Sequence, residues 1–114
     1  MDLKFHKTLS EDRWATVTFA RQLLMIANEL NRAQHWLERD DAEEVRQCYE
    51  RAIELLSLTI SVTKRHSALR ELTRFQELLG ACYLDTKQAL LMNAGMLKAL
   101  LSMDTDAYEA LPSI

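Results

Sequence analysis

The sequence predicts an all-α protein, an up-down antiparallel bundle of three long helices, on three observations. Only two glycines and one proline occur among 114 residues, which removes most of the turn residues that sheets and hairpins require. Apolar residues recur every three or four positions over long stretches, which is the period of a helix face. The segments between these stretches are short, and short connections make consecutive helices antiparallel neighbours. A chain of this length is expected to form one domain.

We expect an extended arm over residues 1–10 and a single helical bundle domain over residues 11–114. Thr8 or Ser10 can cap the first helix, and Glu11, three residues after Thr8, can complete a capping box. One helix is predicted from there to the charged segment 38–41, because its stripe positions alternate in steps of four and three. The stripe is Thr16, Ala20, Leu23, Ala27, Leu30, Gln34 and Leu37, and the spacing of Trp14 and Trp36 puts both on one side of this helix.

The second helix is expected to begin at Asp41, which forms an acidic variant of the capping box with Glu44 three residues later. Its main apolar line is Val45, Tyr49, Ala52, Leu56 and Ile60. The cations of segment 64–66 suit the C-terminus of this helix through the helix dipole, and Ser67 can cap the next one.

The third helix leaves two alternatives open. No glycine, proline or polar loop separates Tyr83 from Thr86, so we favour a long or merely kinked helix over about residues 67–103, which would be ~55 Å long and overhang its partners. The alternative is a fourth helix that begins at Asp85, with Gln88 three residues on. Segment 104–106 is expected to cap one last short turn before Pro112.

Segment 89–103 is the most apolar part of the chain, with eleven apolar residues among fifteen and Lys98 as its single charge. As a helix it would be about 22 Å long, which is short of a membrane span, so we expect it to pack on protein, either this chain or another. The residues expected to bind a partner are Leu90, Met92, Met96, Leu97, Leu100, Leu101 and Met103.

No residue pattern in the chain points to catalysis, a metal or a cofactor. A di-iron bundle needs Glu three residues before His, but Arg32 precedes His35 and Thr63 precedes His66 at that distance. The cysteines and histidines lack the close spacings of a zinc site, and there is no glycine-rich phosphate loop. We therefore expect a non-enzymatic protein without metal or cofactor, in which the two cysteines are buried, reduced thiols.

Charge and composition bear on partners and location. The net charge of −3 and a pI near 5.6 disfavour nucleic acid as the main partner. The candidates for an anion or RNA contact are Lys64, Arg65, Arg70 and Arg74, and the competing interpretation is that these cations balance the helix dipole. The N-terminus lacks an apolar leader and the cysteines do not form a disulfide framework, so we expect a cytoplasmic protein with no membrane association.

Residues 30–61 resemble the central part of the flagellin export chaperone family. The block has a helix with alanine near its end, a short acidic turn, and a second helix with regular aliphatic positions. This resemblance implies a small cytoplasmic helical protein that docks amphipathic helices of a client.

Taken together, these patterns favour a protein-binding bundle, such as an adaptor, chaperone or assembly factor, that uses the apolar Met and Leu face of segment 89–103. The first alternative is a structural homo-oligomer, a dimer above all, or an accessory subunit of a larger complex, in which the same segment is permanently buried. A third hypothesis is a small RNA-binding helical protein that uses segment 64–74.

Overall fold

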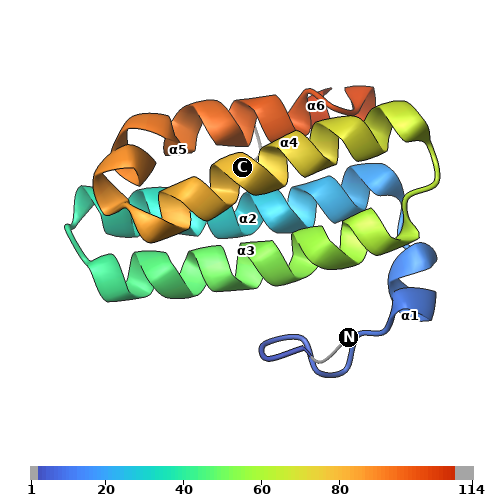
Figure 1. Cartoon of the computed structure of the whole chain (residues 1–114), viewed down its shortest axis with the longest axis horizontal. Helices are drawn as coiled ribbons and strands as arrows, with labels where there is room; N and C mark the ends of the chain where they lie inside the picture. Colours follow the sequence, from blue (N-terminus) through green and yellow to red (C-terminus); the bar gives the residue numbers. More distant parts are fainter. Residues whose placement is uncertain (1–2, 110–114) are drawn as a thin grey trace.

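The computed structural model describes residues 3–109, and over this range all of its regular secondary structure is helix, with no strand (Figure 1). The helices are α1 (Glu11–Ala15), α2 (Phe19–Glu38), α3 (Ala42–Val62), α4 (His66–Leu84), α5 (Thr86–Leu101) and α6 (Thr105–Glu109). The four long helices close a ring of contacts, since α2 and α4 each pack against both α3 and α5. The prediction of an all-α protein is confirmed, and the long helices are four rather than three.

The helix expected to run unbroken from Glu11 to segment 38–41 is interrupted at residues 16–18, so this prediction was wrong. These residues are β-branched, and threonine hydroxyls bond locally in competition with a continuing helix. Thr18 caps α2, its hydroxyl accepting from the Arg21 N–H at 3.2 Å. The Gln22 side-chain amide donates to the carbonyls of Trp14 and Val17, which satisfies the end of α1.

The N-terminal segment lies against α3. Ser10 caps α1, as one of the two expected candidates. Trp14 is fully buried and its indole N–H donates to the Thr59 hydroxyl at 2.9 Å, so it anchors α1 to α3 rather than sharing a helix with Trp36. The Glu54 carboxylate accepts the backbone N–H groups of Phe5 and His6, both at 3.0 Å at the closest oxygen, which holds the arm on α3.

The connection between α2 and α3 follows the expected cap. Asp41 accepts from the Glu44 N–H at 3.2 Å, which confirms the predicted start of α3. Asp40 before it adopts the left-handed conformation, with φ 56°. Further along, the buried carboxylate of Glu29 on α2 accepts from Arg51 Nε on α3 at 3.0 Å. This ion pair joins the two helices through their side chains.

The favoured prediction of a long or kinked third helix was wrong. α4 ends at Leu84, and Asp85 has an extended backbone with φ −143° and ψ 102°. Its carboxylate then caps α5 by accepting from the Lys87 N–H at 3.0 Å, as the alternative prediction had it. The chain reverses at this point, and α5 packs against α4 and α2 (Figure 1).

Of the predictions for the two remaining helix starts, one was wrong and one is confirmed. α4 begins one residue earlier than expected, at His66, and no side chain caps it, so Ser67 lies inside the helix. Asp104 accepts from the N–H groups of Asp106 and Ala107 and begins α6, which confirms the last short turn. Pro112, expected to follow that turn, lies outside the described residues.

Asn93 explains why α5 returns to the bundle. The residue is fully buried, and its Oδ1 accepts from the Tyr49 hydroxyl on α3 at 2.7 Å. Its Nδ2 donates to the Leu30 carbonyl at 2.9 Å and to Gln34 Oε1 at 3.1 Å, both on α2. One amide therefore ties three helices together, and its hydrogen bonds are available only in this arrangement.

Candidate functional site

Most of segment 89–103 belongs to the chain's own core. Met96, Leu100 and Leu101 are buried, because α5 turns these positions toward the other helices. Met92, Leu97 and Met103 are half-buried and pack against the same core. Among the seven residues expected to bind a partner, Leu90 alone is exposed, at 56%. The other six are covered at least in part by this chain's own core, so the seven do not form one free surface.

The apolar side chains that do face solvent were not among the predicted site residues, except for Leu90. Leu91 is 85% exposed and Leu84 is 83% exposed, and Leu78 on α4 is also exposed. The helical period supplies the signal for Leu91, since two residues rotate a helix by about 200° and Leu91 therefore points away from the buried Asn93. That inference requires knowing first that Asn93 is buried.

A groove runs between α4 and α5, and we call it the α4–α5 groove. Leu78 lines it, and Leu91 stands one helical turn before Gly95 of its lining. Its volume is about 300 Å³, and its lining side chains carry carbon and sulfur only. It is lined by Phe75, Leu78, Met92, Gly95, Met96 and Ala99. Gly95 is exposed, and a methyl group at its Cα would meet no heavy atom within 4 Å, so there is open space above it.

The charges along α5 have one sign. Lys87 and Lys98 are both exposed, and residues 86–103 contain no aspartate or glutamate. α5 consequently carries cations only, one near each end, although the whole chain has a net charge of −3.

The four predicted anion-contact residues divide between two places. Arg70 and Arg74 stand on the exposed surface of α4. Lys64 and Arg65 lie in the link between α3 and α4, where both line a cavity of about 330 Å³. We call it the end cavity, and it is also lined by Ala15, Val17, Phe19, Gln22, Val62, Thr63, Ala68 and Asp104.

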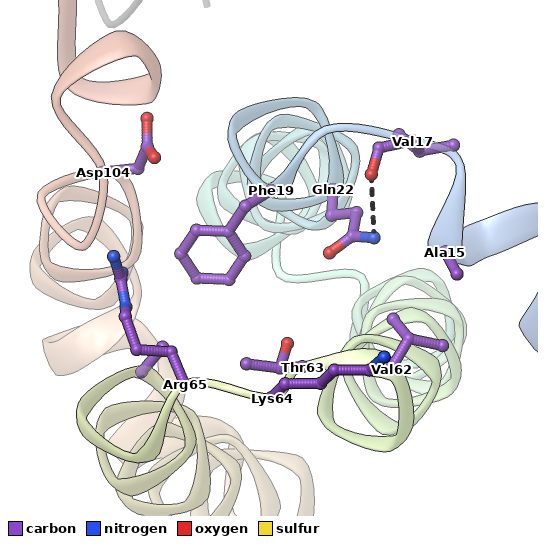
Figure 2. Close-up of a pocket in the computed structure, with 10 residues that line it drawn as sticks. Ala15, Val17, Phe19, Gln22, Val62, Thr63, Lys64, Arg65 and Asp104 are labelled. Carbon is purple, nitrogen blue, oxygen red and sulfur yellow. Dashed lines mark hydrogen bonds between the residues drawn. The ribbon is translucent and has the colours of Figure 1, made fainter.

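Figure 2 shows how these side chains surround the end cavity. Phe19 and Gln22 enter it from α2, and the Gln22 amide hydrogen-bonds to the Val17 carbonyl. Arg65 reaches along the side that also carries Asp104, with its guanidinium carbon 5.9 Å from the centre of the Phe19 ring. Lys64 extends the opposite way, toward Val62. Residues from four helices and three links thus meet at this end of the bundle.

The reactive side chains of the described segment show no activated nucleophile. Burial raises the pKa of both the Cys48 and Cys82 thiols, whereas catalytic cysteines have a lowered pKa. A hydrogen bond to Glu50 raises the pKa of Tyr83. Between residues 3 and 109 no group of three or more His, Cys, Asp or Glu side chains is arranged to hold a metal ion. Within the same range, no helix is both long and apolar enough to cross a membrane.

Comparisons with protein-family models, with curated proteins and with solved structures find no match to this chain. The resemblance of residues 30–61 to the flagellin export chaperones stays a prediction. The α4–α5 groove and the end cavity are therefore the two features from which a role can be argued.

Proposed function

We propose that this chain is a cytoplasmic, non-enzymatic up-down antiparallel bundle that binds a partner protein, as an adaptor, chaperone or assembly factor. Its occupant is an amphipathic helix of the partner, seated in the α4–α5 groove. The observation that carries the proposal is this apolar groove, which the exposed Leu78 lines and next to which Leu91, one helical turn before Gly95, faces water. Contiguous apolar side chains exposed on a surface often mark the place where another protein binds.

The shape of the groove favours a helix over an extended peptide. The groove lies between two parallel ridges of side chains, and a third helix packs into such a groove with its residues at helical spacing. Gly95 and Ala99 supply a low floor that allows close approach of a backbone. Leu78 stands on the α4 side and Met92 on the α5 side, where both can enclose an apolar side chain.

The charges of α5 favour an acidic partner. Lys87 and Lys98 are eleven residues apart, which is about 16 Å along a helix. A partner helix with carboxylates about three turns apart would pair with both cations. Because such rim pairs are exposed, the partner should associate more slowly and bind more weakly as salt concentration rises.

A second copy of this chain is the other candidate occupant and would make the protein a homodimer or a structural subunit. In a two-fold contact between antiparallel α5 helices, Lys87 of one protomer would lie near Lys98 of its partner. Like charges at such a contact are unfavourable, which favours a foreign helix. The resemblance to flagellin export chaperones implies the same mode of binding, a client helix docked on a helical protein.

RNA is the least supported partner. Arg70 and Arg74 lie on the face of α4 while Lys64 and Arg65 line the end cavity, so the four cations supply no single basic stripe. We expect the parent chain not to bind a 20-nucleotide RNA at low salt. An Arg70→Glu/Arg74→Glu variant should behave like the parent chain.

The test uses tagged parent chain and two variants, Leu91→Asp and Leu84→Asp. Both leucines are almost fully exposed, so both variants should keep the parent's helicity and melting temperature, whereas aspartate at the buried Leu100 would unfold the chain. The parent is used to recover a partner from its own cells, and the partner's most acidic amphipathic segment is synthesised and titrated. Leu91→Asp should weaken that peptide at least ~10-fold, and Leu84→Asp should leave it unchanged.

Two results would contradict the proposal. Equal binding by the parent and Leu91→Asp would remove the α4–α5 groove from recognition. A dimer of the parent in light scattering that Leu91→Asp converts to a monomer, with no peptide bound by either, would assign the groove to self-association.

A further inference from the structure

The end cavity has the size and walls of a small-molecule site. Its volume of about 330 Å³ falls within the range of ~300–1,000 Å³ that ligand pockets occupy. Val17, Phe19 and Val62 supply apolar surface from three different elements. This cavity lies at the end of the bundle where α3 connects to α4, whereas the α4–α5 groove lies along the helices.

Gln22 brings an unused acceptor to this cavity. The residue is only 3% exposed, and its amide nitrogen donates to the carbonyls of Trp14 and Val17. Two carbonyl partners identify that atom as the nitrogen, so the other atom is the oxygen. Oε1 points into the end cavity (Figure 2), and among the described residues it accepts no side-chain or backbone hydrogen bond. A ligand with an N–H or O–H group could donate to it.

The cavity also carries positive potential at its edge. The Arg65 guanidinium lies over the Phe19 ring, and arginine binds carboxylates with two parallel hydrogen bonds. α4 begins at this point without a side-chain cap, so its free first-turn N–H groups add the positive end of a 19-residue helix. Asp104 is the opposing charge, and its carboxylate already accepts two N–H groups of α6.

From this juxtaposition we propose that the end cavity binds a small amphipathic carboxylate. The carboxylate meets Arg65, the apolar body rests on Phe19, Val17 and Val62, and an N–H or O–H on that body donates to Gln22 Oε1. This site is separate from the proposed partner-binding groove, and its occupancy does not require a partner protein.

The first experiment titrates the full chain with indole-3-acetate, followed by two-dimensional ¹H–¹⁵N NMR. This probe combines an aromatic body, a carboxylate and one N–H donor. Saturable shifts are expected at the amides of Val17, Gln22 and Ala68. Indole-3-acetamide, which lacks the charge, should bind about 10-fold more weakly, because a charge-assisted contact is lost. Naphthalene-1-acetate, which lacks the N–H donor, should bind about 5-fold more weakly.

The second experiment compares Arg65→Gln with Arg70→Gln. Both arginines are exposed residues of the same helix region, so both variants should fold like the parent, but only Arg65 lines the cavity. Arg65→Gln should weaken indole-3-acetate about 10-fold, and Arg70→Gln and Leu91→Asp should leave it unchanged.

The proposal is overturned by any of three results: no saturable shift up to millimolar probe, equal binding of the acid and its amide, or equal effects of the two arginine variants. Shifts confined to residues of the α4–α5 groove would also overturn it. Because Leu91→Asp is included, failure here is distinguishable from failure of the proposed partner binding.

Discussion

The pairs α2–α3 and α4–α5 are built from similar lengths of helix but differ in what covers them. The first pair is joined by the ion pair of Glu29 and Arg51, and the N-terminal arm is held on α3 by Glu54. The second pair has no ion pair between its helices among the described residues, and its outer surface includes Leu78, Leu91 and the α4–α5 groove. The difference indicates that α2–α3 is the more strongly linked pair and that α4–α5 carries the exposed apolar surface.

The buried polar residues show how the two pairs are held together. Asn93 of α5 bonds to both α2 and α3, so the second pair is attached to the first by an amide inside the core. The attached face of α5 is thereby specified, and its opposite face is left for solvent or a partner.

The largest difference in the free energy of unfolding is expected between two leucines of α5. Leu100→Ala should lower the free energy of unfolding by about 3 kcal/mol, because it opens a cavity in a fully buried site. Leu91→Ala, on the exposed face, should change it by less than about 0.5 kcal/mol. Urea unfolding followed by circular dichroism measures both. Similar losses for the two variants would mean that the outer face of α5 is covered in solution.

Asn93→Ala should lower the free energy of unfolding by about 2 kcal/mol. The variant leaves the Tyr49 hydroxyl, the Leu30 carbonyl and the Gln34 amide oxygen without this partner in a buried place. Asn28→Ala, at an exposed position of α2, is the matched control and should be nearly neutral. If the control destabilised the chain as much in the same urea titration, Asn93 would not be the attachment point of α5.

Glu54→Gln should lower the free energy of unfolding by about 1 kcal/mol and loosen the N-terminal arm. The glutamine keeps the shape but loses the charge that strengthens the hydrogen bonds from Phe5 and His6. Native-state hydrogen exchange should show faster exchange of those two amides, while the amides of α5 are unchanged. Glu43→Gln, an exposed residue of the same helix, should leave the arm protected.

The smallest effect at neutral pH concerns the two thiols. Burial raises the pKa of Cys48 and of Cys82, so native protein binds these protons more tightly than the unfolded chain does. Their contribution to stability is therefore full below about pH 8.5, the pKa of an unperturbed thiol, and is lost as pH rises beyond it.

The rate of thiol alkylation tests which of the two helix pairs opens more readily. With iodoacetamide at pH 7.5 both thiols should react slowly, because thiolate forms only when the site opens. Cys82 on α4 should be modified before Cys48 on α3, as read by mass spectrometry of peptides. The reverse order would place the less stable region in α2–α3.

Several elements of the fold were predictable because their signals are local. Asp41 and Asp104 cap the helices that the sequence predicts, since a cap acts on an N–H two or three residues away. The break at Asp85 is also a cap, yet the sequence favours a continuous helix there, because no glycine, proline or polar loop separates Tyr83 from Thr86. Nothing local distinguished the two, because the reversal is stabilised by Asn93, whose partners lie 44 to 63 residues earlier.

The candidate site was less predictable for the same reason. An apolar segment indicates that burial is needed but not which of its residues face inward, and here Leu100 and Leu101 fill the chain's own core. The end cavity joins Phe19, Arg65 and Asp104, which lie far apart in sequence and show no shared pattern. Arg65 was identified for its charge alone.

The placement of the two tryptophans has a practical consequence. Trp14 is fully buried beside α3 near the end cavity, while Trp36 is half-buried at the opposite end of α2. These are the chain's two indoles, so a Trp36→Phe variant would emit from one end of the molecule and a Trp14→Phe variant from the other. Fluorescence would then show whether the two ends melt together or in succession, with no added label.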